Sequence, residues 1–153
     1  GYSFGGAVGY EMACMLTREK YEVSLIIIDT MPVWRDRWRH FRSAWRAARQ
    51  GDVSTGFGRV AGAIGSKTVR NNIEEAHLLA GNQYKPTALN GVRTLLIQSA
   101  DSGGGEDLAA EWQSLTGSDL TVVKVAGDHF SMMRGENASN VAAAVRRWLD
   151  QTI

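Results

Sequence analysis

The chain has 153 residues, of which 44% are hydrophobic and 22% charged, and its formal net charge is +1 at pH 7. This composition is that of an ordinary globular protein, and the near-neutral charge gives no reason to expect nucleic acid or an acidic membrane as a partner. The single cysteine, Cys14, excludes an internal disulfide, and the chain has no thiol cluster suited to zinc.

Residues 1–6 (Gly-Tyr-Ser-Phe-Gly-Gly) contain a Gly-x-Ser-x-Gly pattern. The pattern is typical of a nucleophile elbow, in which a strand ends, the backbone turns sharply at the serine and a helix begins at once. We expect the glycines to be required because side chains in so tight a turn would collide with neighbouring strands. The turn would expose the Ser3 hydroxyl and direct the Phe4 N–H, at a helix N-terminus, toward an oxyanion.

An elbow needs a strand before it, and this sequence begins at the elbow itself. We therefore expect the chain to be the C-terminal part of a domain whose first strands lie upstream. The loop that supplies a second oxyanion donor would also lie upstream of Gly1.

Downstream of the elbow, helical and strand patterns alternate. A helix is predicted over residues 5–17, from apolar residues at helical spacing: Ala7, Val8, Met12, Met15 and Leu16. Residues 23–28 form a nearly continuous aliphatic run, which is typical of a strand buried on both faces of a parallel sheet. Further strands are predicted over residues 92–99 and 120–125.

Two more helices complete the pattern. The first lies between the last two strands, with Leu108, Trp112 and Leu115 on one face. The second closes the chain, with a buried stripe of Val141, Val145, Trp148 and Leu149. Strands that alternate with helices predict an α/β fold: a parallel sheet with right-handed crossovers, in a single partial domain over residues 1–153.

A long segment separates the first two strands. Residues 34–50 predict a helix with an aromatic stripe on one face and arginines on the other, locally +5 in charge, and residues 67–79 predict a second helix. We expect the aromatic stripe to be a packing face rather than a nucleic-acid or membrane surface. The arginines, Arg39 and Arg42 among them, form either a plain solvated face or a docking surface for an acidic partner.

Four polar residues follow the predicted strand ends, where ligands bind in parallel sheets: Ser3, Asp29, Asp101 and His129. Serine, acid and histidine in this chain order are typical of an α/β-hydrolase, where the histidine is the base and the carboxylate orients it. The other two histidines, His40 and His77, fall inside the insertion helices. Both aspartates are sterically reasonable acids, because either loop can lean over the histidine.

The elbow, the Ile-Ile-Ile-Asp-Thr strand end at residues 26–30, Tyr-Lys-Pro at 84–86 and Gly-Asp-His-Phe-Ser-Met-Met at 127–133 together resemble the thioesterase domain of nonribosomal peptide and polyketide synthases. The resemblance covers nearly the whole chain. In that family the acid follows the strand after the elbow, which favours Asp29 over Asp101. It also implies that residues 33–90 form a mobile helical lid over an acyl channel.

The resemblance implies a cytoplasmic serine thioesterase that binds no cofactor itself and no metal. Its substrate would be an acyl or peptidyl chain on the phosphopantetheine arm of a carrier protein, released by hydrolysis or cyclisation through an acyl-enzyme on Ser3. The alternatives are a stand-alone α/β-hydrolase esterase, and a catalytically dead scaffold whose basic lid binds a partner. Labelling of the serine and a comparison of thioesters with oxygen esters would separate these functions.

Overall fold

A computed structural model describes residues 1–32, 76, 80–81, 83–101 and 108–151 of the chain. The chain divides into two compact units, the first comprising residues 1–32 and 86–153 and the second residues 33–85. Almost all described residues belong to the first unit. The predicted helix over 34–50 lies outside the described residues, and so does the predicted helix over 67–79 except for residue 76. Outside them too are Arg39, Arg42, His40 and His77, so the lid remains a prediction.

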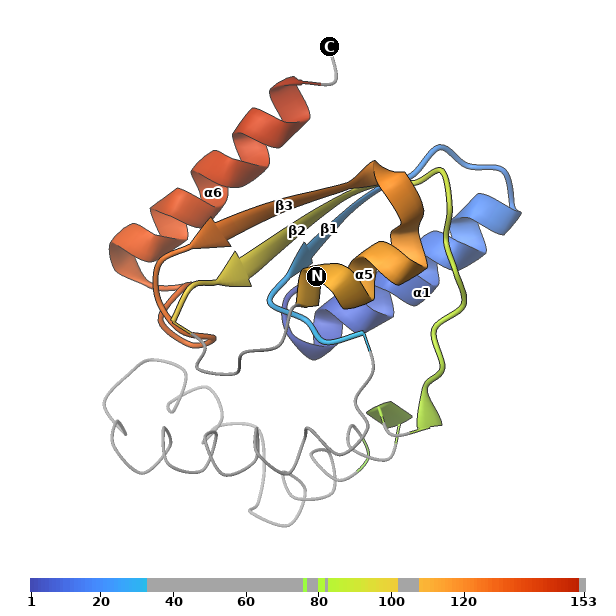
Figure 1. Cartoon of the computed structure of the whole chain (residues 1–153), viewed down its shortest axis with the longest axis horizontal. Helices are drawn as coiled ribbons and strands as arrows, with labels where there is room; N and C mark the ends of the chain where they lie inside the picture. The colour runs from blue at the N-terminus through green and yellow to red at the C-terminus, as the bar shows by residue number, and fades with distance from the viewer. Residues whose placement is uncertain (33–75, 77–79, 82, 102–107, 152–153) are drawn as a thin grey trace, which may run out of the picture. The chain divides into compact units, whose positions relative to one another are not determined.

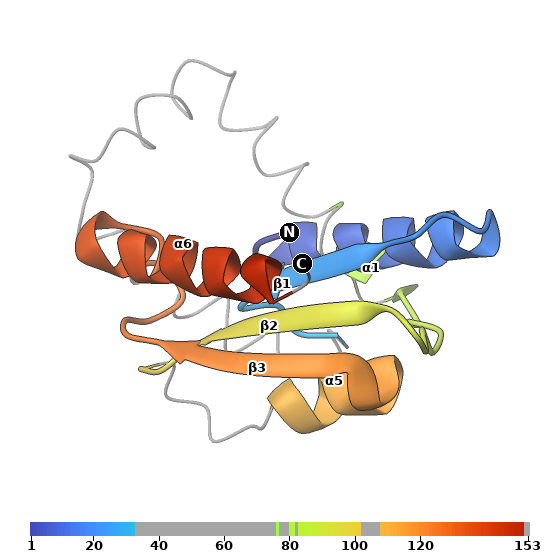
Figure 2. The ribbon, with the colours of Figure 1, turned by 90° about the horizontal axis from the view of Figure 1, so that it is seen from above.

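The first unit contains a sheet of three parallel strands, β1 (Ser24–Ile28), β2 (Arg93–Ser99) and β3 (Leu120–Val125), in that order (Figures 1 and 2). The central strand β2 is almost wholly buried, as a continuous aliphatic run in a parallel sheet should be. Strand β3 has several exposed residues and forms an edge among the described strands. The predicted α/β class and the parallel sheet with flanking helices are confirmed.

Helices cover both faces of the sheet. Helices α1 (Phe4–Arg18) and α5 (Leu108–Thr116) lie on one side and α6 (Gly135–Asp150) on the other (Figure 1). The side chains of successive β2 residues point to opposite faces of the sheet. Leu96 packs with the α1 and α5 side chains, whereas Leu95 and Ile97 pack with those of α6.

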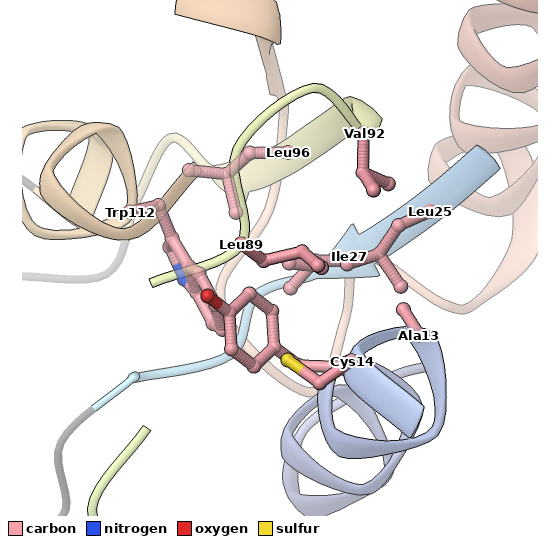
Figure 3. Close-up of a cluster of buried hydrophobic side chains, with 9 residues drawn as sticks. Ala13, Cys14, Leu25, Ile27, Leu89, Val92, Leu96 and Trp112 are labelled. Atoms are coloured by element: carbon pink, nitrogen blue, oxygen red, sulfur yellow. The ribbon is translucent and has the colours of Figure 1, made fainter. Parts of the chain in front are cut away.

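The core between α1, α5 and the sheet is shown in Figure 3 and includes Trp112, which is fully buried. Its indole N–H donates to the Thr30 carbonyl oxygen at 2.7 Å, so the indole N–H is satisfied within this core. The fully buried Tyr10 packs against the indole at 5.1 Å between ring centroids and donates its hydroxyl to the Thr87 carbonyl oxygen at 2.7 Å. These bonds hold the segment after β1 and the approach to β2 against the helices.

The helices predicted outside the insertion are present as α1, α5 and α6, but the buried faces of α1 and α6 differ from expectation. In α1 the residues facing the core are Gly6, Ala7, Tyr10, Ala13 and Cys14. The apolar stripe expected there is largely exposed, at 46% for Val8, 56% for Met12 and 58% for Met15. In α6, Leu149 is 47% exposed, and Ala144 is buried with Val141 and Trp148 instead. Small residues make up most of the buried face of α1, because they let the helix approach the sheet closely.

Candidate active site

The backbone before the nucleophilic turn runs along the side of β1 opposite β2. The Gly1 amino group donates to the Ile26 carbonyl oxygen at 2.7 Å, and Ile28 N–H donates to the Gly1 carbonyl oxygen at 2.8 Å. Ser3 N–H then donates to the Ile28 carbonyl oxygen at 3.0 Å, and Tyr2 forms a parallel bridge with Ile28. Residues 1–3 therefore pair with β1 like the end of another parallel strand, which fixes the height at which the chain turns.

The glycines of the turn have different roles. A Cβ added at Gly1 would lie 2.1 Å from the Gly5 carbonyl oxygen, and one added at Gly6 would lie 2.0 Å from the Thr30 Oγ1 atom. At Gly5 itself an added Cβ would meet nothing within 4 Å. The expected collision with neighbouring strands is therefore wrong for the glycines of the pattern. The obstacle at Gly1 is the turn itself, and at Gly6 it is the loop after β1.

Ser3 is the N-cap residue of α1, but its side chain makes no capping hydrogen bond. N-cap serines ordinarily use the hydroxyl to accept a bond from the first helical turn. The backbone of Ser3 is also strained, with φ 54° and ψ −129°, a conformation that costs a non-glycine residue about 1–3 kcal/mol. The hydroxyl is therefore not used to cap the helix and is left for another partner.

That partner is His129. The Nε2 atom of His129 lies 3.1 Å from the Ser3 Oγ atom, and its Nδ1 atom lies 2.7 Å from the Oδ2 atom of Asp29. Both His129 and Asp29 are buried, at 9% and 8% exposure. A hydroxyl, an imidazole and a carboxylate thus form one continuous hydrogen-bonded line, although 126 residues separate the serine from the histidine.

Asp29 directly follows β1 and is held as an anion. Its Oδ1 atom accepts hydrogen bonds from both the N–H and the hydroxyl of Ser99, each at 2.8 Å. Burial by itself would raise the pKa of Asp29, but the bonds from His129 and Ser99 outweigh it and hold the pKa below the usual value. Like Ser3, Asp29 has a positive φ, 45°, so the serine and the aspartate that hydrogen-bond to the imidazole both carry backbone strain.

Asp101, the other candidate acid, contacts the histidine loop rather than the histidine ring. Its Oδ2 atom accepts the Gly127 N–H at 3.0 Å, and its own N–H donates to the Gly127 carbonyl oxygen at 3.1 Å. Gly127 has φ 97°, and a Cβ there would lie 2.7 Å from the side-chain amide of Asn137. Asp101 therefore anchors the start of the loop that carries His129.

The end of the same loop is closed by Asp128. Its carboxylate accepts bonds from the N–H groups of Phe130 and Ser131, at 2.9 and 2.8 Å, and from the Ser131 hydroxyl. The bonds from Ser131 lower the pKa of Asp128, with the Phe130 N–H adding to the effect. His129 is thus the central residue of a turn that is tied down on both sides.

A sequence profile of the thioesterase domain family matches residues 1–149. The chain belongs to the thioesterase domain family. The solved NocB thioesterase domain, in covalent complex with a fluorophosphonate nocardicin G analogue, is 30% identical over 97% of this chain, with a TM-score of 0.68. The chain spans only 63% of that structure's length.

Other solved thioesterases share the fold at lower identity. The RedJ thioesterase from the prodiginine pathway of Streptomyces coelicolor is 20% identical with a TM-score of 0.69, and the alignment covers 97% of this chain and 61% of that one. The surfactin-cyclising thioesterase domain SrfTE is 20% identical with a TM-score of 0.63, over 97% of this chain and 65% of the other. A search of curated proteins gave no match.

Two residues that support the candidate site were not singled out from the sequence. Ser99 donates its hydroxyl to the Oδ1 atom of Asp29, the oxygen that does not face His129. The buried Thr30 donates its hydroxyl to the Ser3 carbonyl oxygen at 2.8 Å. A polar residue at the end of each buried strand was the available signal, because such residues face the edge where ligands bind. Within the described ranges, no cluster of three potential metal ligands occurs, and no helix is long and apolar enough to cross a membrane.

Proposed function

We propose that this protein is a serine thioesterase in which Ser3 is the nucleophile, His129 the general base and acid, and Asp29 the carboxylate that orients the histidine. The observation that carries the proposal is the hydrogen-bonded line from Ser3 Oγ through His129 to Asp29, with distances of 3.1 and 2.7 Å. The N-cap hydroxyl that makes no cap bond points to the same role, because the helix forgoes a stabilising interaction there.

In the first half of the reaction, His129 Nε2 takes the proton from the Ser3 hydroxyl as the oxygen attacks the thioester carbonyl carbon. The tetrahedral intermediate carries a negative oxygen, which the Phe4 N–H stabilises from the first residue of α1. The carbon–sulfur bond then breaks, His129 returns the proton to the departing thiolate, and an ester on Ser3 remains.

In the second half, His129 deprotonates a water molecule or an internal hydroxyl or amine of the acyl chain. Attack by that group releases an acid or a ring and returns the proton to Ser3 Oγ. Asp29 stays ionised throughout, accepts the Nδ1–H and stabilises the imidazolium that forms in both halves.

The thioester is presented, in this proposal, on the phosphopantetheine arm of an acyl or peptidyl carrier protein. Support comes from the family of the chain and from its similarity to NocB, whose thioesterase domain belongs to the nocardicin cluster. Arg39 and Arg42, outside the described residues, are the proposed docking surface for the carrier or its phosphate.

The test is covalent labelling followed by turnover. A fluorophosphonate probe should add one adduct to the full chain, seen by intact mass, and none to Ser3→Ala. Ser114→Ala is the matched control, since Ser114 is exposed on α5 and donates its hydroxyl to the Glu111 carbonyl oxygen. An adduct that persists in Ser3→Ala would refute the nucleophile, and a preference for an oxygen ester over the matched pantetheine thioester would make the protein an esterase.

A further inference from the structure

The residue before the nucleophile reaches across to the base. The Tyr2 ring stacks on the His129 imidazole, with 4.9 Å between the centroids and 22° between the planes. Its hydroxyl donates to the His129 backbone carbonyl oxygen. Tyr2 therefore touches both the ring and the backbone of His129, from a position 127 residues away in the chain.

The backbone of Tyr2 is itself fixed within the turn. It forms the parallel bridge with Ile28, and its carbonyl oxygen accepts the Gly5 N–H at 2.9 Å. Any movement of the Tyr2 side chain is therefore limited to rotation about its own bonds. Because Tyr2 is fixed in the turn that carries Ser3 and also contacts His129, it fixes the position of the histidine relative to that turn.

A second constraint on the imidazole is needed for geometric reasons. The bond from Nδ1 to Asp29 fixes one atom of the ring, but the ring can still pivot about that bond and swing Nε2 away from Ser3. A flat contact on one face of the ring prevents this pivot. The Phe130 ring, whose edge contact is 5.2 Å between centroids at 90°, meets the imidazole in a different orientation and does not set its plane.

We propose that Tyr2 is a positioning residue for the base, which sets the plane of the His129 imidazole by stacking and its height by the hydrogen bond to the His129 carbonyl oxygen. This proposal rests on the proposed function, since positioning matters only if His129 is the base. Burial, with Asp29 and Asp128 nearby, raises the pKa of Tyr2 to about 12, so the phenol remains a neutral donor at neutral pH.

Two substitutions separate the two contacts. Tyr2→Phe keeps the ring and loses the hydroxyl, and the loss of one hydrogen bond should lower kcat about tenfold or less. Tyr2→Leu loses the stacking as well, and a misplaced reacting group should lower kcat about a hundredfold with KM unchanged. Tyr21→Leu is the matched control, because Tyr21 is 65% exposed and lies outside the site.

The experiment measures kcat and KM on a pantetheine thioester, the rate of fluorophosphonate labelling, and the low-field proton resonance of the His129 Nδ1–H in the absence of substrate. The resonance should be sharp in the unmodified protein and Tyr2→Phe and broadened in Tyr2→Leu. An unchanged kcat and resonance in Tyr2→Leu, or a raised KM at constant kcat, would overturn the proposal.

The outcomes also separate this proposal from the proposed function. Failure of the unmodified protein to label at Ser3 would refute the serine thioesterase, whereas the resonance reports the imidazole alone. If Tyr2→Leu loses its thermal unfolding transition, Tyr2→Phe carries the test. A kcat and a labelling rate in Tyr2→Phe indistinguishable from those of the unmodified protein would then refute the role of the hydroxyl.

Discussion

The two aspartates near the histidine loop give the sharpest test of the site. We expect Asp29→Asn to abolish most of the activity and Asp101→Asn to leave most of it. The two substitutions are matched, because each replaces one carboxylate by an amide of almost the same size. Their different effects follow from what each carboxylate accepts.

In Asp29→Asn the side-chain oxygen would stay with Ser99, which donates two hydrogen bonds to Oδ1 at 2.8 Å. The new NH₂ group would then face His129 Nδ1 and donate to it. This arrangement favours the tautomer with the proton on Nε2, which cannot accept the proton of Ser3. A wrong tautomer of this kind costs about 10⁴-fold in kcat, which is about 5.4 kcal/mol of transition-state stabilisation.

In Asp101→Asn the amide oxygen can still accept the Gly127 N–H, now 3.0 Å from the carboxylate. Only the difference between a charged and a neutral acceptor is lost, about 1 kcal/mol or roughly fivefold in rate. The assay is kcat/KM on a pantetheine thioester with the fluorophosphonate labelling rate, and thermal unfolding shows that both variants fold. A greater loss in Asp101→Asn, or a loss below tenfold in Asp29→Asn, would refute the assignment.

Three further outcomes are expected. Gly6→Ala should destabilise the protein by about 1–3 kcal/mol in urea unfolding, because the new Cβ would overlap a threonine hydroxyl, whereas Gly5→Ala meets open space and should not. Because the pKa of Asp29 is lowered in the folded protein, its contribution to stability is complete above the unfolded value of 3.8 and is lost as the pH falls through the folded value. Asp29→Asn should therefore flatten the acid side of a stability-versus-pH curve; an unchanged slope would contradict this. Charge reversal at Arg39 and Arg42 should weaken carrier binding and reduce the salt dependence of that binding, measured by titration at two ionic strengths. Equal affinities of the charge-reversed and unmodified proteins for the carrier would refute the assignment of these arginines as a docking surface.

The strands were predictable because burial on both faces leaves a plain signal. The aliphatic runs at 23–28, 92–99 and 120–125 coincide with β1, β2 and β3 to within one residue. The buried face of α1 was not predictable from hydrophobicity, because the more apolar residues Met12 and Met15 are exposed. The turn brings the helix so close to the loop after β1 that only a glycine fits against Thr30. Close approach, rather than apolar area, selects the buried face there.

The supporting residues of the site were hidden for a different reason. Ser99 binds Asp29 only because β1 and β2 are paired in one particular register, with Ile28 beside Ile97. More than sixty residues separate those strands in the sequence, and nothing in either aliphatic run specifies which residues of the two strands lie side by side. The order of the elements was enough to select Ser3 and His129 and left Asp29 and Asp101 both open as the acid, and only the family resemblance favoured Asp29. The partner of Asp29 needed the register.

The same register accounts for the convergence of the site. Tyr2 is bridged to Ile28, Ile28 pairs with Ile97, and Ile97 pairs with Val123, so four segments are aligned at one height. Ser3 and Asp29 each follow this level by one residue, and both have positive φ. A strained residue persists only where its surroundings over-determine it. Here the pairing of residues 1–3 with β1 and of β1 with β2 supplies that constraint. The sheet therefore sets the positions of the hydroxyl and the carboxylate, and the loop after β3 brings the imidazole of His129 between them.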